Sequence, residues 1–411
     1  MRLHIDNEYD KLEAVLVHRP GNEIDRLTHE NKQRFLFEDV PYLRRMQDEH
    51  DAFVGTMRGQ GVQVHYLKDL LAEVLRDESD RRELMAEVCR AEGVAAMTDD
   101  LAGLRYWNEE ETLDLLFAGL TIGEYQDATG KRMAAGSNGD HFLLPPIPNA
   151  YFSRDPAVIV RDAAISSKMH FAERVRETLL TRAVLEHHPE FRDNVMTYGG
   201  TDEPTEDRPY TIEGGDVIIL SPDAVIVGDS ERTRSETIEL LAAKCFQYGH
   251  VKRVYEIPIP SDRAFMHLDT VFTILDRGVV VWYSEVMRSI KWIHRYQPRG
   301  EDDPTALRVS EERSFPDILR DEFEMDVTII ETAGGSKPHD AREQRADGTN
   351  VLALAPRLAV TYKRNERTNA ALESHGIICL GIDDAELVRG LGGPRCMTMP
   401  LRRSSGDGAS R

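Results

Sequence analysis

The sequence lacks the features that mark membrane-spanning and exported proteins. No apolar run reaches the roughly 18 to 20 residues that a membrane-spanning helix needs. The opening residues, Met1 to Asp6, lack the basic and then apolar form of a signal peptide. We therefore expect no membrane partner and a cytoplasmic location.

Cysteine is scarce and widely spaced. The chain has 4 cysteines, Cys89, Cys245, Cys379 and Cys396, and no two of them lie close together. This spacing excludes a zinc knuckle and a disulfide framework. Cys89 in a helical segment, and Cys245 and Cys379 in apolar runs, are typical of core positions. Cys396 is left as the candidate reactive thiol.

Basic residues are in the minority. Lys and Arg total 51 against 72 Asp and Glu, which gives a formal net charge of -21. Such a chain is a poor partner for nucleic acid and for an anionic membrane surface, and it suits a cationic ligand, although net charge also serves solubility. With 411 residues, 41% hydrophobic and 30% charged, the chain is long enough for about two or three average domains, or one large one.

Short apolar, β-branched runs with helical patterns between them predict an α/β fold. Ser221 to Asp223 and Asp276 to Gly278 separate pairs of such runs with the chemistry of hairpin turns. Helices are predicted at 42–58 and at 230–246, the latter with Ser230 as N-cap. The predicted strands are 13–17, 62–67, 157–160, 216–220, 224–228, 270–275, 279–283, 327–331, 351–354, 358–362 and 377–381.

These elements group into about five similar units of hairpin, helix and strand, without a fixed period. They lie near 12–67, 150–200, 210–258, 267–331 and 350–400. Residues 69–140 differ, because they are rich in Leu, Ala, Glu and Arg and predict three or four helices followed by a loop. We expect a main α/β domain of residues 1–68 and 141–402, an inserted helical subdomain at 69–140, and a disordered tail at 403–411.

Two acidic motifs lie where strands begin or end. In Glu213-Gly-Gly-Asp216 the glycines allow close backbone approach and place two carboxylates across a turn. A plain polar loop before a hairpin is the alternative. In His267-Leu-Asp269 a strand period of two would put the imidazole and the carboxylate on one face, as an acid/base group with a cation-binding neighbour or as a structural pair.

A thiol and two arginines complete the set. Cys396 follows a glycine loop and Arg395, a setting that can lower a thiol pKa, whereas most lone cysteines are buried and inert. Arg174 and Arg232 lie near helix beginnings and could each hold a carboxylate by paired hydrogen bonds, or could be ordinary surface residues. Taken together, one thiol, one imidazole, carboxylates and arginines suit a substrate that is cationic at one end and anionic at the other, such as free arginine.

The ordered motifs resemble those of the arginine deiminases, within the guanidino-group-modifying (pentein) superfamily, over nearly the whole chain. The matching segments are Lys11-Leu-Glu-Ala-Val-Leu-Val-His-Arg-Pro20, Phe35-Leu-Phe-Glu-Asp-Val-Pro-Tyr-Leu43, Pro148-Asn149, Ser153-Arg-Asp-Pro156, Arg176-Glu-Thr178, His187-His-Pro189, Ile212-Glu-Gly-Gly-Asp216, Ser230-Glu-Arg-Thr233, Met266-His-Leu-Asp-Thr270 and Arg389-Gly-Leu-Gly-Gly-Pro-Arg-Cys-Met-Thr-Met-Pro400.

The resemblance implies a five-bladed α/β propeller whose channel holds the active site, and hydrolysis of L-arginine to L-citrulline and ammonia through a covalent cysteine intermediate, with no metal or organic cofactor. A homodimer or homotetramer is what the family suggests. The residues that match the catalytic positions are Cys396 as nucleophile, His267 as general acid/base, Glu213 as its carboxylate partner, and Asp155 and Asp269 on the guanidinium. The residues that match substrate-binding positions are Asn149, Phe152, Arg174, Asp216, Arg232 and Arg389, the last in a gate loop.

Other readings of the same residues are weighed against this one. An amidinotransferase would transfer the amidino group to an amine, and a methylarginine hydrolase would use the same chemistry on a shorter chain. A non-catalytic arginine-binding relative would not need the thiol. A metalloenzyme built on Cys396, His267 and Asp269 would lose activity with a chelator.

Overall fold

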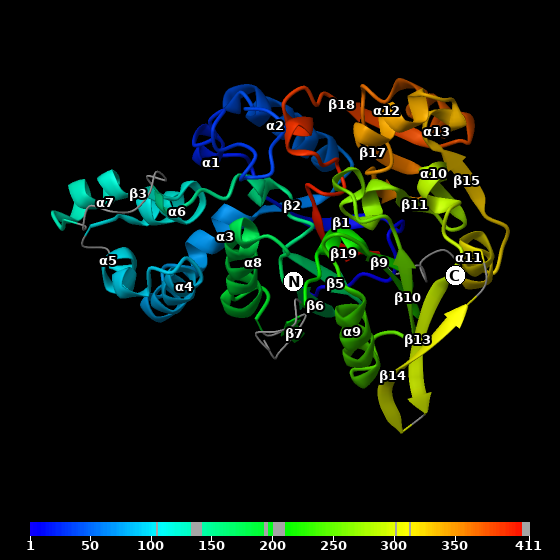
Figure 1. Cartoon of the computed structure of the whole chain (residues 1–411), viewed down its shortest axis with the longest axis horizontal. Coiled ribbons are helices and arrows are strands. Elements are labelled where there is room, and N and C mark those ends of the chain that lie inside the picture. The colour runs from blue at the N-terminus through cyan, green and yellow to red at the C-terminus, as the bar shows by residue number, and fades with distance from the viewer. Residues whose placement is uncertain are drawn as a thin grey trace.

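The computed structural model describes residues 1–103, 106–132, 142–192, 196–199, 210–300, 302–311 and 314–404. It is a mixed α/β structure in which short sheets occupy the centre and helices the outside (Figure 1). In the described part of the chain, no helix combines the length and the apolar character needed to span a membrane. The predicted tail lies from residue 405 outside the described residues, as does the end of the predicted insertion at 133–140.

One three-stranded unit recurs five times in the described part of the chain. Its first two strands form an antiparallel pair, a helix follows, and the third strand pairs in parallel with the second. Four units follow one another: β5 (Ala157–Val160), β6 (Ala163–Ser166), α8 (Val175–His187), β7 (Met196–Gly199); β8 (Val217–Ser221), β9 (Ala224–Asp229), α9 (Ser235–Gln247), β10 (Arg253–Pro258); β11 (Phe272–Asp276), β12 (Val279–Trp282), α11 (Phe315–Phe323), β15 (Thr328–Glu331); β16 (Leu352–Ala355), β17 (Leu358–Tyr362), α13 (Glu366–Ser374), β18 (Ile378–Ile382).

The fifth unit joins the two ends of the chain. Its outer strand β19 (Met399–Arg403) pairs antiparallel with β1 (Leu12–Val17), so that Leu16 lies opposite Met399. After α2 (Leu43–Gly59), strand β2 (Gln63–Tyr66) pairs in parallel with β1. The five units predicted from the sequence are therefore confirmed, with the difference that the first unit takes its outer strand from the C-terminal region.

Each predicted strand is present, but four strands of the repeated units, β6, β7, β10 and β19, are absent from the predicted strands. All four residues of β5, β6 and β12 are buried, which is the pattern of strands covered on both faces. The hairpin between β11 and β12 turns at Gly278, whose φ of +72° favours glycine. The largest apolar cluster runs from Leu3 through β5, β6, β8 and β9 to Leu401, and also includes Cys89 and Cys245.

The helices between β2 and β5 lie together at one end of the long axis (Figure 1). They are α3 (Leu67–Val74), α4 (Glu78–Ala91), α5 (Thr98–Ala102), α6 (Glu109–Ala118) and α7 (Ile122–Thr129), with the short strand pair β3 (Leu120–Thr121) and β4 (Phe142–Leu144). Asp77 caps α4, and capping boxes begin α6 and α7. The expectation of three or four helices misses one, because α5 is little more than a single turn.

Two local expectations are wrong. Helix α9 begins at Ser235 rather than at Ser230, because the Ser230 hydroxyl accepts from the backbone N–H groups of Arg232 and Thr233 and forms a separate turn. The long hairpin of β13 (Ile293–Gly300) and β14 (Asp303–Glu311), which extends the sheet of β8 to β10, is absent from the predicted strands. The remaining short helices are α1 (Asn22–Asp25), α10 (Ser284–Met287) and α12 (His339–Arg345).

Candidate active site

The predicted catalytic residues occupy equivalent places in different units. Asp155 precedes β5, Glu213 precedes β8, His267 and Asp269 precede β11, and Cys396 precedes β19, so each lies in the turn that leads into the first strand of its unit. The contacts described below bring these turns together. All five residues are at most 4% exposed, which places their charges out of bulk water.

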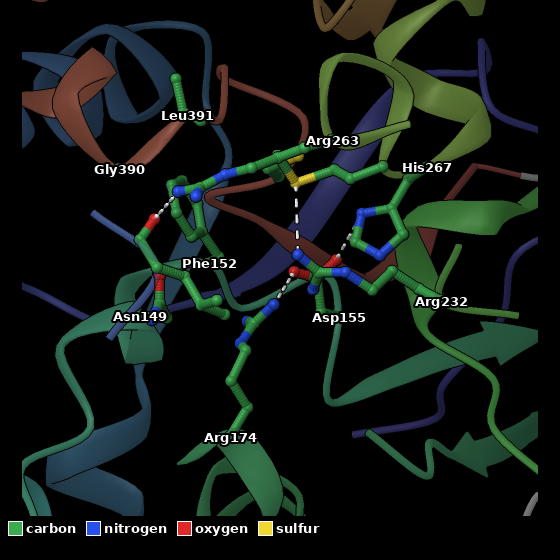
Figure 2. A pocket seen from close by; sticks show the side chains of 12 residues that line it. Asn149, Phe152, Asp155, Arg174, Arg232, Arg263, His267, Gly390 and Leu391 are labelled. Carbon is green, nitrogen blue, oxygen red and sulfur yellow. Dashed lines mark hydrogen bonds and ion pairs between the residues drawn. The ribbon is translucent and has the colours of Figure 1, made fainter. Parts of the chain in front are cut away.

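A small cavity lies where these turns meet (Figure 2). The predicted site residues among its lining are Asn149, Phe152, Asp155, Arg174, Arg232, His267 and Cys396. Leu36, Arg263, Met266, Gly390 and Leu391 complete it. Of the other predicted residues, Glu213 and Asp269 contact lining residues, while Asp216 and Arg389 do not reach the cavity.

His267 is held between two carboxylates. Its Nε2 lies 2.8 Å from Glu213 Oε2, and its Nδ1 lies 3.7 Å from Asp155 Oδ1. Burial opposes the charge on the imidazole, but Asp155 and the hydrogen bond with Glu213 outweigh it and raise the pKa of His267 to about 9. A Cβ at position 215 would lie 2.5 Å from His267 Nδ1, so Gly215 is what lets this ring approach.

Glu213 is the anion that two arginines and the imidazole share. Arg232 NH1 donates to Glu213 Oε2 at 3.2 Å, and Arg174 NH1 lies 3.7 Å from the same oxygen. Burial opposes ionisation, but Arg232, the His267 hydrogen bond and Arg174 outweigh it and hold the pKa of Glu213 well below its ordinary value. Glu213 is therefore ionised across the physiological pH range, and it orients an imidazolium.

The Cys396 thiol lies in a buried, electronegative place. Its Sγ is 3.5 Å from Asp269 Oδ2 and accepts from Asn350 Nδ2 at 3.0 Å. Burial and then Asp269, Asp155 and Asp347 raise the pKa of Cys396 well above its ordinary value, and they outweigh Arg395, which lowers it. Without a bound cation, this thiol stays protonated near neutral pH.

Asp155 and Asp269 each accept a hydrogen bond from an arginine through one carboxylate oxygen, while the other oxygen accepts none. Asp155 Oδ2 accepts from Arg174 NH1 at 2.8 Å, and Asp269 Oδ2 accepts from Arg395 NH1 at 2.7 Å. The Oδ1 atom of each is buried and has no hydrogen-bond partner among the described residues. Two buried, unpaired carboxylate oxygens beside a thiol are acceptors suited to the N–H groups of a planar cation.

The two predicted carboxylate-binding arginines enter the cavity from different units. Arg174 precedes α8 and is fixed by Glu177, which accepts from its Nε at 3.1 Å and from its NH2 at 2.7 Å. Arg232 lies in the turn after β9, with its guanidinium 4.5 Å from the Phe171 ring. Both guanidinium groups point toward the neighbourhood of Asp155 (Figure 2).

Phe152 and Asn149 form another wall of the cavity. Asn149 Nδ2 donates to the Phe35 carbonyl at 2.8 Å. A Cβ at position 392 would lie 2.2 Å from Phe152 Cε1, and one at position 390 would lie 2.1 Å from Tyr151 Oη. The glycines of the Cys396 loop therefore make room for these aromatic rings.

Two predicted substrate-binding residues lie elsewhere. Asp216 accepts from Leu268 N at 2.8 Å and from Ser230 Oγ at 2.7 Å, so it supports the turn that carries Arg232 rather than reaching the cavity. Arg389 points away and pairs with Asp39 and with Glu386 Oε2, the latter at 2.9 Å. The adjacent Gly390 and Leu391 line the cavity in its place.

The reason given for pairing His267 with Asp269 is also wrong. These residues do not share the face of a strand, because residues 268 to 270 form a 3-10 turn ahead of β11. The turn directs His267 toward Glu213 and Asp269 toward Cys396 and Arg395. Both residues reach the site, by a different local geometry.

Sequence reasoning missed Arg263 and Asn350. Arg263 crosses the cavity in Figure 2, donates from NH2 to the Leu36 carbonyl at 3.1 Å, and lies 3.3 Å from Glu38 Oε1. Nothing in its sequence context signals this position. Asn350 had a signal, because it is a polar residue immediately before the predicted strand 351–354, as Asp269 is before the predicted strand 270–275.

Asp155, Glu213 and His267 also have the ligand types of a cation site, with their ligand atoms within 4.8 Å of one another. The same carboxylates already bind Arg174 and Arg232, at 2.8 Å and 3.2 Å. These N–H groups occupy Asp155 Oδ2 and Glu213 Oε2, which a metal ion would need as ligands, whereas Asp155 Oδ1 is still able to accept a hydrogen bond. The donor set therefore fits a hydrogen-bonded acid/base site better than a metal site.

Comparison with known proteins identifies both the fold and the family of this chain. The fold matches an amidinotransferase of the saxitoxin biosynthetic pathway from Microseira wollei, with a TM-score of 0.58 and 15% identity over 98% of both chains. It also matches a cysteine-to-serine mutant of DDAH from Pseudomonas aeruginosa complexed with citrulline, with a TM-score of 0.51 and 14% identity over 95% of this chain and 99% of that one. The chain therefore has the mixed α/β fold of these two proteins.

Comparison of sequences identifies the family to which the chain belongs, which the fold alone does not. The arginine deiminase family model matches residues 33–403. The chain is also 36% identical to an arginine deiminase of Listeria monocytogenes over 412 aligned residues, covering 98% of each protein. The chain belongs to the arginine deiminase family.

Proposed function

We propose that this protein hydrolyses L-arginine to L-citrulline and ammonia through a covalent intermediate on Cys396, with no cofactor. Membership of the family supports the reaction. The observation that carries the assignment of residues is that Asp155 Oδ1 and Asp269 Oδ1 accept no hydrogen bond from the described residues, in a site that also holds the thiol and the Glu213–His267 pair. This arrangement suits a guanidinium that must be held and attacked at its carbon.

Binding orients the substrate from both ends. The two aspartates accept from the guanidinium N–H groups, which presents the central carbon to Sγ. Arg174 and Arg232 hold the substrate carboxylate, while Asn149 and Phe152 surround its α-amino end. On this proposal Arg389 belongs to a gate near the entrance, and Asp216 positions Arg232 through Ser230 without touching the substrate.

The chemistry proceeds in two halves. The Cys396 thiolate attacks the guanidinium carbon, the Sγ–C bond forms, and His267 gives its proton to the departing nitrogen as the C–N bond breaks. Ammonia leaves and a thiouronium remains on Cys396. Neutral His267 then takes one proton from water as the new C–O bond forms, and the C–Sγ bond breaks as the remaining hydroxyl proton passes to solvent, which regenerates the Cys396 thiolate and protonated His267. Over the cycle, the arginine cation and water give citrulline and ammonium, so atoms and charge balance.

The bound cation itself activates the thiol. In the empty site Asp269, Asp155 and Asp347 oppose the thiolate. A guanidinium on these aspartates neutralises their effect and lowers the pKa of Cys396 when the substrate is in place. The thiol is thereby protected from other electrophiles until arginine binds.

The proposal extends to the architecture. The five repeated units would form the blades of an α/β propeller, with the site in its channel. Residues 1–68 and 141–402 would be the catalytic domain, 69–140 an inserted subdomain, and the assembly a homodimer or homotetramer.

The test is a product assay on purified protein with L-arginine and no added metal. Citrulline and ammonia in equal amounts, abolished by Cys396→Ala, are expected. Absence of both products from the unmodified, folded protein would overturn arginine hydrolysis. Citrulline without ammonia would contradict the leaving-group step, and transfer of the amidino group to an added amine would indicate an amidinotransferase instead.

A further inference from the structure

Four of the five units contribute a predicted catalytic residue from the turn before their first strand. The unit of β16, β17 and β18 contributes none of those predicted. The equivalent position in this unit belongs to Asn350, which lies two residues before β16 and is 0% exposed. We propose that Asn350 is a further catalytic residue, whose side-chain amide holds the Cys396 sulfur and stabilises its thiolate form.

The amide binds Cys396 at two atoms. Asn350 Oδ1 accepts from the backbone N–H of Cys396 at 3.0 Å, and Asn350 Nδ2 donates to Sγ at 3.0 Å. The orientation of the amide is not arbitrary, because a backbone N–H can only donate and therefore requires the oxygen on its side. The N–H donor must then face the sulfur.

The surrounding chain is built for this approach. A Cβ at position 393 would lie 2.5 Å from the Asn350 carbonyl oxygen and 2.9 Å from its Oδ1. Glycine at 393 is therefore needed for the nucleophile loop to close on Asn350. Asn350 Nδ2 also lies 3.4 Å from the Asp269 carbonyl, which ties the amide to the turn that carries the guanidinium-binding carboxylate.

The contact favours the ionised sulfur. Burial opposes the thiolate most, and the negative charges of Asp269 and Asp155 add to its effect. Among the described residues, Asn350 is the side chain recorded as donating a hydrogen bond to Sγ. A neutral amide can stabilise a thiolate without neutralising the aspartates that bind the substrate cation, which a nearby lysine or arginine would do.

Two variants of Asn350 test the donor together. Asn350→Asp keeps the size of the side chain and an oxygen for the Cys396 N–H, and it replaces only the group that donates to sulfur. Its new charge also opposes the thiolate directly, so Asn350→Ala, which removes the donor without adding a charge, must shift the thiol titration in the same direction if the hydrogen bond is what stabilises the thiolate.

The experiment measures alkylation of Cys396 by iodoacetamide across pH in substrate-free protein, followed by mass spectrometry of the Cys396 peptide. The inference rests on the proposed function, but this experiment does not require arginine turnover. A failure of the inference can therefore be told apart from a failure of the proposed function. We expect Asn350→Asp and Asn350→Ala to shift the thiol titration to higher pH and to slow alkylation about tenfold at a pH below that titration, because one pKa unit is a tenfold change. In turnover, kcat should fall more than KM rises.

Asn365→Ala is the matched control, since Asn365 is 2% exposed and donates only to the Ala346 carbonyl, at 2.8 Å. It should alkylate with the unmodified protein's pH profile. The inference is overturned if folded Asn350→Ala keeps that profile, or if folded Asn350→Asp keeps both that profile and the unmodified kcat. Should Asn350→Ala fail to fold, an unchanged profile and kcat in the Asp variant would still overturn the inference.

Discussion

His267 Nε2 lies 2.8 Å from Glu213 Oε2, and both side chains are at most 1% exposed. This pairing sets the protonation state with which catalysis begins. The carboxylate keeps the imidazole protonated, with a pKa of about 9, and the proton it retains is the one that the leaving nitrogen needs.

Glu213→Gln should therefore move the high-pH limb of activity to lower pH. Asp155 and Glu213 both raise the pKa of His267, and the amide keeps the shape of Glu213 but removes its share, so the imidazole loses its proton earlier as pH rises. We expect kcat to fall by about 10²- to 10⁴-fold, the range of general acid/base contributions. The measurement is the pH dependence of kcat.

Glu23→Gln is the control for this variant, because Glu23 is a buried carboxylate 2.9 Å from His18 outside the site. It should leave the high-pH limb in place. A limb at the same pH in Glu213→Gln and in the unmodified protein would mean that His267 is not the proton donor.

Substrate should lower the thiol pKa. Iodoacetamide labelling of Cys396 is expected to rise only at high pH in the empty protein, and to shift to lower pH with an unreactive arginine analogue that occupies the guanidinium site and leaves the sulfur open. The cation offsets Asp155 and Asp269, which raise the pKa of Cys396. Identical titrations with and without the analogue would rule out activation by the substrate.

Arg232→Lys should weaken arginine binding through the substrate carboxylate. Lysine keeps the charge but cannot form two parallel hydrogen bonds, so we expect KM for arginine to rise about tenfold. Decarboxylated arginine should show no such rise, since it lacks the group that Arg232 binds. Arg234→Lys, on the same segment, is the control. An equal loss with both substrates would place the role of Arg232 at Glu213 instead.

Glu8 should stabilise the protein in a pH-dependent way. It is buried, and its Oε1 lies 3.0 Å from Arg395 NH2 and 3.7 Å from Arg154 NH1. Burial opposes its charge, but Arg395, Arg154 and Arg403 outweigh it and lower the pKa of Glu8 from 4.5 to about 2. Because the folded-state pKa is depressed, this stability is fully present above pH 4.5 and is lost as pH falls through about 2.

Glu8→Gln should cost about 3 to 5 kcal/mol near neutral pH, because it leaves buried arginines without their counter-charge. Urea unfolding at several pH values measures this, and the difference from the unmodified protein should shrink as pH falls from 4.5. Glu13→Gln, which removes a half-exposed pairing with Arg402, should cost about 1 kcal/mol or less. Equal losses in the two variants would contradict this account of Glu8.

The strands that could be predicted from the sequence have apolar runs, which are local signals. Examples are β5 and β9, where nearly every residue is buried. The sequence could not reveal the pairing of β1 with β19, since Leu16 and Met399 meet only when the two chain ends come together. Ser230 does not cap α9, because its hydroxyl accepts hydrogen bonds from the backbone N–H groups of Arg232 and Thr233 instead. Short-range propensity does not decide between two such hydrogen bonds.

The catalytic residues were found through the family resemblance more than through local structure. The strand argument for His267 and Asp269 was wrong although both residues reach the site. Arg389 does not line the cavity, because its guanidinium forms ion pairs with Asp39 and Glu386 instead. Asn350 and Arg263 were missed, since their roles depend on contacts with residues far away in the chain, Cys396 and Leu36.

The most direct test of the mechanism is acid quench during turnover with L-arginine, followed by mass spectrometry of the peptides. The unmodified protein, quenched during the first turnovers, is suitable because both halves of the reaction keep their acid and base groups. We predict an adduct on Cys396 with the mass of arginine less one ammonia, absent from Cys396→Ala. An unmodified Cys396 peptide during continuing citrulline formation, or citrulline formation by Cys396→Ala, would contradict covalent catalysis at this residue.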